Sequence, residues 1–293
     1  MARFVLSAFA DEAGDSLEAQ ITALKENGIH FIEPRNIGGK GILTLTDDEL
    51  DTVKAELDKN GIKVNSLGSP IGKFPIEKPL DEHLPDLMRA FEVCKKLGTT
   101  NIRMFSFFVE QNQLGRYRDE VIARLRKMVA LANENGIRLC HENESRIFGQ
   151  NPAEVEDVIN SVEGLYAIFD AANYRMNNCD IEHGINATLI RPAYLHIKDA
   201  VFNEQAIVPA GEGEGHIAEV LDKVNSEVDG VVYLTLEPHL FQFTAYKDID
   251  DHELKGRHYF ENNRQAFDFA VKALKELLIS NGYIEDENHE WIK

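Results

Sequence analysis

The sequence predicts an α/β fold, a (β/α)₈ TIM barrel formed by a single domain over residues 1–293. Apolar runs typical of strands alternate with helix-like segments from end to end, and the composition shows no linker or second domain. Asn-Gly-Ile occurs three times, at residues 27–29, 60–62 and 135–137. Asn-Gly is typical of a helix end, and each isoleucine then begins an apolar run. A doubly wound open sheet is the alternative architecture.

The first half of the chain contains four expected strands and the helices that follow them. The strands are expected at residues 4–9, 29–33, 61–66 and 101–105. Helices are expected at residues 16–26, 81–97 and about 116–135. A further helix follows the second strand, where Thr46 and Glu49 fit a capping box and Leu50, Val53 and Leu57 share one face.

The second half repeats the same alternation. Four more strands are expected at residues 137–142, 165–170, 193–196 and 231–237. Asn151 and Pro152 mark the start of a helix, because proline suits the first helical turn. The last helix is expected at residues 264–281. Eight strands alternating with helices favour the closed barrel.

Bulk properties exclude several classes of protein. The net charge of −19 makes nucleic acid an unlikely partner, since an acidic surface repels phosphate backbones. Apolar runs stay shorter than the roughly 20 residues that span a bilayer, so no membrane partner is expected. The first residues turn acidic too soon for a signal peptide. Three cysteines without metal-type spacing fit a reducing, cytoplasmic location.

Each of the last four expected strands ends in a residue that can bind a metal ion. These residues are Glu142, Asp170, His196 and Glu237. Three carboxylates and one imidazole form a hard, mostly oxygen-based ligand set for a divalent metal. Strand ends one strand-plus-helix unit apart meet at the same rim of a barrel. The sequence therefore predicts a metal at the barrel mouth, although a carboxylate at a strand end, taken alone, is more often a helix cap or half of a salt bridge.

The order Glu, Asp, His, Glu on successive strands resembles the xylose isomerase-like TIM-barrel superfamily of sugar isomerases and epimerases. The phrases that carry the resemblance are Cys140-His-Glu-Asn-Glu144, Phe169-Asp-Ala-Ala-Asn173, Leu195-His-Ile-Lys-Asp199, Leu236-Glu-Pro-His239 and Pro209-Ala-Gly-Glu-Gly-Glu-Gly215. The resemblance covers nearly the whole chain. It implies a sugar or sugar-phosphate isomerase or epimerase, and it leaves open whether the protein is a homo-oligomer (dimer or tetramer).

The resemblance also implies roles for two of the ligands. In similar ketose epimerases, the residues that match Glu142 and Glu237 bind the metal and face each other across the substrate. One removes the proton next to the carbonyl, the metal stabilises the enediolate, and the other returns a proton. Mn²⁺ or Mg²⁺ suits this ligand set best, and Co²⁺ or Zn²⁺ can substitute.

Asn173 departs from the family pattern, because many members have a histidine there. That histidine contacts substrate in epimerases, so we expect Asn173 to lie beside the substrate. The departure leaves a second reaction open: a dehydratase or lyase acting on a keto sugar or inosose from the same metal site. A DNA-repair endonuclease is disfavoured, since the extra histidines of its zinc cluster are missing. A non-catalytic sugar-binding barrel is the remaining alternative.

Other residues near the strand ends are candidate substrate contacts. They are Glu33, Arg103, Lys198 and His239. For Glu33 and Arg103, an ion pair within the barrel is an equal alternative, and His239 could merely line the rim. Gly211, Gly213 and Gly215 could bind a phosphate through backbone N–H groups, but the glutamates between them favour a merely flexible loop. The tail at residues 283–293, with Trp291, is expected to be an interface or a frayed end.

Overall fold

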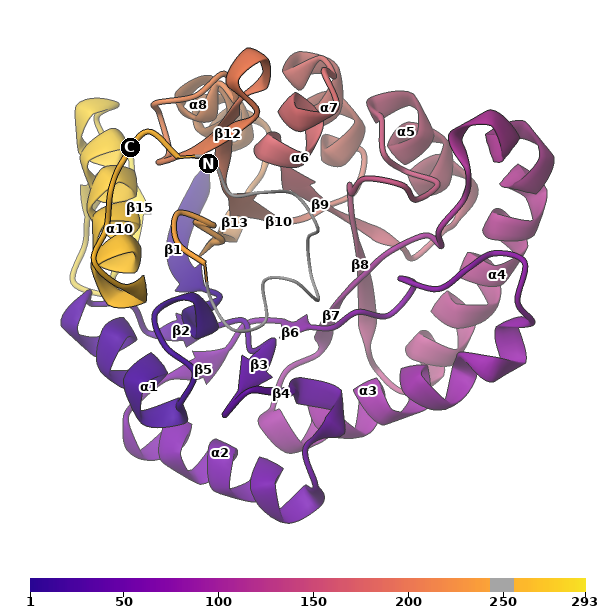
Figure 1. The fold of residues 1–293 in the computed structure, drawn as a ribbon, viewed down its shortest axis with the longest axis horizontal. Coiled ribbons are helices and arrows are strands. Elements are labelled where there is room, and N and C mark those ends of the chain that lie inside the picture. The colour runs from indigo at the N-terminus through magenta and orange to yellow at the C-terminus, as the bar shows by residue number, and fades with distance from the viewer. Residues whose placement is uncertain (243–255) are drawn as a thin grey trace.

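The computed structural model describes residues 1–242 and 256–293, which form the predicted (β/α)₈ barrel (Figure 1). Seven parallel strands lie side by side in one sheet, in the order β1 (Ala2–Ala8), β13 (Gly230–Leu236), β10 (Pro192–Ile197), β9 (Tyr166–Asp170), β8 (Arg138–Glu142), β7 (Asn101–Met104) and β6 (Leu67–Gly68). A separate parallel pair, β2 (Phe31–Ile32) and β5 (Lys63–Val64), completes the ring. Glu33 N donates to Ala8 O at 3.0 Å, and Gly68 N donates to Pro34 O at 3.1 Å. These bonds join the short pair to its neighbours on both sides.

Helices surround the ring of strands (Figure 1). They are α1 (Leu17–Glu26), α2 (Asp47–Lys59), α3 (Leu84–Leu97), α4 (Leu114–Glu134), α5 (Pro152–Ser161), α6 (Ala171–Met176), α7 (Ile181–Leu189), α8 (Ile217–Glu227) and α10 (Asn263–Ser280). Two small hairpins lie outside the ring: β3 (Asn36–Ile37) with β4 (Lys40–Gly41), and β11 (Asp199–Val201) with β12 (Ala206–Val208). None of the helices in the described ranges is long and apolar enough to cross a membrane.

Local sequence explains where several helices begin and end. Thr46 and Glu49 form the predicted capping box at the start of α2, and Asn151 and Glu154 form a second one at α5. The Asn of each Asn-Gly-Ile repeat is the C-cap of its helix, and the following glycines have φ between +66° and +70°. Glycine adopts this left-handed conformation without steric cost, so the repeat serves as a helix stop.

The third expected strand, at residues 61–66, is split in the structure. Its first part, β5, pairs with β2, whereas β6 begins only at Leu67 and pairs with β7. Between them, Asn65 O accepts hydrogen bonds from the side chains of Thr99 and Asn101, at 3.1 and 2.9 Å. These side chains supply the hydrogen bonds that backbone N–H groups of a paired strand would otherwise donate to Asn65 O.

The expectation for the C-terminal tail is corrected. Trp291 is only 3% exposed, and it lies in β15 (Glu290–Ile292), which pairs with β14 (Ile284–Glu285) and with β1. Phe4 of β1 is the register partner of Trp291. The tail is therefore an integral strand of the sheet rather than a frayed end.

Candidate metal centre

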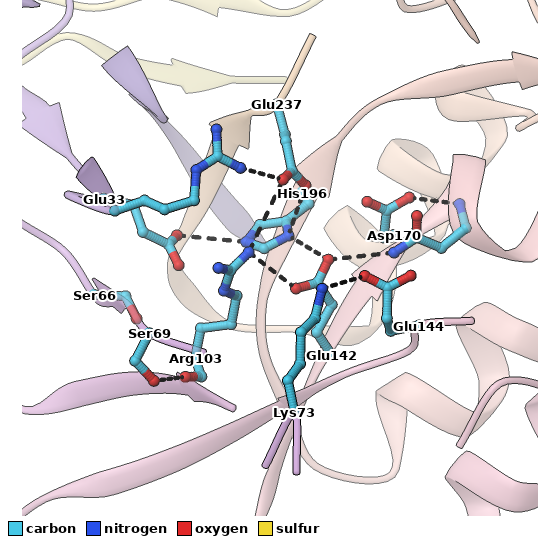
Figure 2. Close-up of polar contacts among 12 residues, drawn as sticks. Glu33, Ser66, Ser69, Lys73, Arg103, Glu142, Glu144, Asp170, His196 and Glu237 are labelled. Atoms are coloured by element: carbon cyan, nitrogen blue, oxygen red, sulfur yellow. Dashed lines mark hydrogen bonds and ion pairs between the residues drawn. The ribbon is translucent and has the colours of Figure 1, made fainter. Parts of the chain in front are cut away.

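Four buried side chains converge at the carboxyl ends of neighbouring strands. Glu142 ends β8, Asp170 ends β9, His196 is the fifth residue of β10, and Glu237 directly follows β13. One ligand atom from each lies within 4.8 Å of the others. Figure 2 shows the four side chains pointing toward one another, with His196 between Glu142 and Glu237. Parallel strands end at one rim of the barrel, so residues far apart in the sequence form this cluster, which we call the ligand quartet.

The two ring nitrogens of His196 have different partners. Nδ1 lies 3.0 Å from Glu142 Oε1 and 3.5 Å from Glu237 Oε2, whereas Nε2 lies 3.4 Å from Glu33 Oε2. Burial alone would lower the pKa of His196, but the carboxylates of Glu142 and Glu33 outweigh it and raise the pKa to about 10. The cluster therefore favours positive charge at the imidazole.

Buried cations lie against the carboxylates of the ligand quartet. Lys198 Nζ is 3.0 Å from Asp170 Oδ2 and 3.4 Å from Glu237 Oε2, and Arg103 Nη1 is 3.3 Å from Glu142 Oε2. Burial works to raise the pKa of Glu142, but His196 and Arg103 dominate and lower it to about 2. For Asp170, burial wins over Lys198 and raises the pKa to about 6.

The donor set fits a divalent cation. Ligand atoms bound at about 2.0–2.3 Å from one ion lie at most about 4–4.6 Å apart, so separations up to 4.8 Å require only small adjustments. Asp170 Oδ2 is buried and forms no hydrogen bond within the described residues. It is paired with the ammonium group of Lys198 and is free to accept a further positive charge such as a metal ion. Carboxylate oxygens with one imidazole nitrogen suit Mg²⁺ or Mn²⁺, and Zn²⁺ also accepts them.

Four candidate substrate contacts border the ligand quartet. Asn173 Nδ2 donates to Glu142 Oε1 at 3.4 Å and to Asn143 O at 2.8 Å. His239 Nε2 lies 3.4 Å from Glu237 Oε1. Arg103 and Lys198 contact the same two glutamates, as described above. The structure thus brings these four residues together around the carboxylates of Glu142 and Glu237.

Glu33 has a different place. Its side chain is fully buried, and its carboxylate lies between the Nε2 side of the His196 ring and the Tyr194 hydroxyl, which donates to Glu33 Oε1 at 2.7 Å. Glu33 is therefore separated from the carboxylates of Glu142 and Glu237 by the imidazole.

The backbone N–H groups of the glycine loop, a candidate phosphate site or flexible loop in the sequence, have a partner within the protein. Gly211, Gly213 and Gly215 all donate their backbone N–H groups to the Asp199 carboxylate, at 2.8–3.1 Å. A Cβ at Gly213 would lie 2.2 Å from Asp199 Oδ1, so glycine is required for this approach. The Asp199 carboxylate therefore occupies the place in this loop where an anion would bind.

Three polar residues near the site were not among those predicted from the sequence. Glu12 ends a short 3-10 helix (Ala10–Glu12) that follows β1, and it accepts a hydrogen bond from His239 N at 2.7 Å. Its position in the segment after a strand could have revealed it. Tyr194 precedes His196 by two residues, so strand alternation places both on one face. Lys73, which pairs with Glu144 at 3.0 Å, comes from a loop and gave no sequence signal.

Glu12, Glu237 and His239 form a second buried group with metal-binding atoms close together. Arg35 already supplies a positive charge there, with Nη2 3.3 Å from Glu12 Oε1 and Nη1 2.8 Å from Glu237 Oε1. Because Lys198 and Arg103 lie equally close to the ligand quartet, nearby cations do not separate the two groups. The quartet offers three carboxylates against two here, so it is the better metal site.

Solved structures share this fold at low sequence identity. An IolI protein with a bound zinc atom matches with a TM-score of 0.72 at 16% identity, over 95% of this chain and 99% of that chain. L-Ribulose 3-epimerase matches with a TM-score of 0.69 at 16% identity, over 96% of each chain. AsbF from Bacillus anthracis, a probable 3-DHS dehydratase involved in petrobactin synthesis, matches with a TM-score of 0.67 at 12% identity, over 94% of this chain and 99% of that chain.

At these identities the structural matches establish the fold alone. No curated protein matches the sequence. A family model described as a xylose isomerase-like TIM barrel matches residues 21–277, which is most of the chain. The chain therefore belongs to the xylose isomerase-like TIM-barrel family.

Proposed function

We propose that this protein is a divalent-metal-dependent isomerase or epimerase that moves a proton on the carbon next to the carbonyl of a polyhydroxy ketone. The observation that carries the proposal is the ligand quartet: three buried carboxylates and one imidazole whose donor atoms lie within 4.8 Å of one another. Mn²⁺ or Mg²⁺ is the expected ion, with Co²⁺ or Zn²⁺ as substitutes. A cation held there would supply Lewis-acid stabilisation of the negative charge that develops on the carbonyl oxygen.

Glu142 and Glu237 are the proposed proton-transfer pair. They reach His196 Nδ1 from strands on either side of β10, at 3.0 and 3.5 Å. Nearby cations overcome the effect of burial and lower the pKa of both glutamates, so each is ionised at neutral pH. One ionised carboxylate can then remove the proton, and the second, after taking up a proton from water, can return one from the other side.

Four of the proposed substrate contacts touch this pair. Arg103 and Asn173 touch Glu142, whereas Lys198 and His239 touch Glu237. A substrate bound between the two carboxylates would contact all of these donors at the same time. Their N–H groups can hold the hydroxyl and carbonyl oxygens of a sugar and fix the carbon that loses its proton.

An unphosphorylated substrate fits this site better than a sugar phosphate. The backbone N–H groups of the glycine loop, the natural binding place for a phosphate, already bind Asp199. Lys73 near the site is paired with Glu144 at 3.0 Å. The carboxylates of Asp199 and Glu144 therefore place negative charge beside the groups that would otherwise bind a phosphate.

The test uses keto sugars and cyclic polyhydroxy ketones, each with and without phosphate, incubated with Mn²⁺-loaded protein in D₂O. We expect deuterium next to the carbonyl of an unphosphorylated compound. Glu142→Gln and Glu237→Gln should each lower that exchange by at least about 100-fold, the scale of general acid–base catalysis. Glu219→Gln, at an exposed position on α8, is the matched control and should exchange normally. Full activity in both site variants would contradict the proposal.

Elimination from the same site is the second candidate, and Asn173 favours it. An asparagine cannot act as an acid or base, and this side chain is engaged with Glu142 and Asn143 O. One glutamate could then remove the proton and pass it to the oxygen of a neighbouring hydroxyl, which leaves as water, as in a dehydratase. Elimination yields an unsaturated ketone that absorbs ultraviolet light, whereas epimerisation does not, so absorbance in the same assay separates the two. Metal binding without turnover of any compound would instead indicate a sugar-binding barrel.

A further inference from the structure

A chain of buried contacts runs from His196 away from the other metal ligands. His196 Nε2 lies 3.4 Å from Glu33 Oε2, and the Tyr194 hydroxyl lies 2.7 Å from the other oxygen, Glu33 Oε1. The Tyr194 oxygen is also 2.9 Å from Ser66 Oγ. All four side chains are at most 2% exposed.

We propose that Tyr194, acting through Glu33, is a positioning residue that fixes the orientation and tautomer of His196 and so sets the affinity of the ligand quartet for its metal. This inference rests on the proposed metal site, and it adds a role that the ligands themselves do not supply.

The geometry of the ring requires such a partner. Nδ1 faces Glu142 and Glu237, so it is the nitrogen that can bind the cation, and the proton of the neutral ring then belongs on Nε2. Nε2 and Glu33 Oε2 are both buried, and neither has a hydrogen bond in the described part of the chain, but they form an ion pair with each other at 3.4 Å. A carboxylate behind a metal-binding histidine fixes its tautomer and raises its basicity.

Glu33 in turn needs Tyr194. A fully buried carboxylate is costly unless hydrogen bonds satisfy it, and the Tyr194 hydroxyl is the donor to Glu33 Oε1. Ser66 can donate to the phenol oxygen, which orients the phenol proton toward Glu33.

Packing makes Tyr194 a fixed support. It lies two residues before His196 on β10 and therefore on the same face of the strand. In the layer below the quartet it packs against Cys140 of β8 and Ile168 of β9. A ring packed against residues of two other strands has little room to move, so it can define where Glu33, and through it His196, lies.

The experiment compares metal affinity in the full-length protein, measured by Mn²⁺ titration and by competition with a chelator. Tyr194→Phe removes only the hydroxyl and should weaken Mn²⁺ binding by about 10- to 100-fold, the usual effect of losing an outer hydrogen-bond partner. Glu33→Gln should weaken it at least as much, because its amide N–H₂ can turn toward His196 Nε2–H. Tyr174→Phe is the matched control: Tyr174 is also buried, but its hydroxyl has no hydrogen bond within the described residues.

Unfolding midpoints of the metal-free variants separate positioning from a purely structural role. A structural role would lower the midpoint and leave the affinity of the folded protein unchanged. Wild-type affinity in Tyr194→Phe and Glu33→Gln would therefore overturn the inference, whatever their stability. A wild-type protein that binds no metal would contradict the proposed site itself, and the inference with it.

Discussion

Lys198 Nζ lies 3.0 Å from Asp170 Oδ2, and both side chains are almost completely buried. Lys198 also lies 3.4 Å from Glu237 Oε2, so one ammonium group is shared by two of the proposed metal ligands. Arg35 also pairs with Glu237, at 2.8 Å, so Lys198 matters most for Asp170. Lys198 therefore holds part of the site together in the metal-free protein.

Removing that ammonium should destabilise the metal-free protein. In Lys198→Met we expect a loss of about 3–5 kcal/mol, because a buried carboxylate loses its charge partner, and saturating Mn²⁺ should restore part of it. Urea denaturation with and without Mn²⁺ measures both effects. Lys127→Met is the control, since its ion pair with Asp81 is exposed and should matter little. Equal losses in the two variants would contradict a structural role for the buried pair.

The C-terminal strand should contribute strongly to stability. Trp291 is 3% exposed in β15, beside β1, so Trp291→Ala should cost about 3–5 kcal/mol through lost burial and a cavity. Its neighbour Ile292 is 41% exposed, and Ile292→Ala should cost much less. Chemical denaturation of the two variants tests this directly. A small loss at Trp291 would mean that the tail is not an integral part of the sheet.

Buried His83 should make the free energy of unfolding depend on pH. Burial lowers the pKa of His83 although Asp86 opposes it, and Gly72 N donates to His83 Nε2 at 2.9 Å, which requires the neutral ring. The unfolded chain then binds the proton more readily than the folded protein. The contribution of neutral His83 to the free energy of unfolding is complete above about pH 6.5. Below that pH the contribution decreases, by at most about 1.4 kcal/mol per pH unit.

His83→Gln should reduce the slope with which the free energy of unfolding falls toward low pH. The glutamine oxygen can accept the hydrogen bond from Gly72 N, and the amide does not titrate. Denaturation between pH 7 and pH 5 gives the slope. His183→Gln, on the exposed surface of α7, should leave the slope as in the wild type. An unchanged slope in His83→Gln would show that another group causes the acid sensitivity.

Much of the fold was predictable because its signals are local. Alternating apolar runs and the Asn-Gly helix ends indicate serial strands and helices, and the structure confirms the barrel. The split of the third strand was not predictable, since it depends on Thr99 and Asn101 bonding to Asn65 O across the barrel wall. Trp291 was misjudged for the same reason, because its partner Phe4 lies at the other end of the sequence.

The ligand quartet could be predicted because barrel strands end at one rim, so a metal-binding residue at each of four strand ends implies proximity. The partners of those residues could not. The contacts of Glu33 with His196 and of Lys198 with Asp170 join different strands and depend on rotamers and burial. The link between Asp199 and the glycine loop needs a backbone path that composition does not specify.

The most direct test of the account is anomalous diffraction from crystals of the protein grown with Mn²⁺. We expect one strong manganese peak bound by Glu142, Asp170, His196 through Nδ1, and Glu237, with Glu33 on the Nε2 side of the ring. A manganese peak at Glu12 and His239 instead, or no peak among the four residues at saturating Mn²⁺, would contradict it.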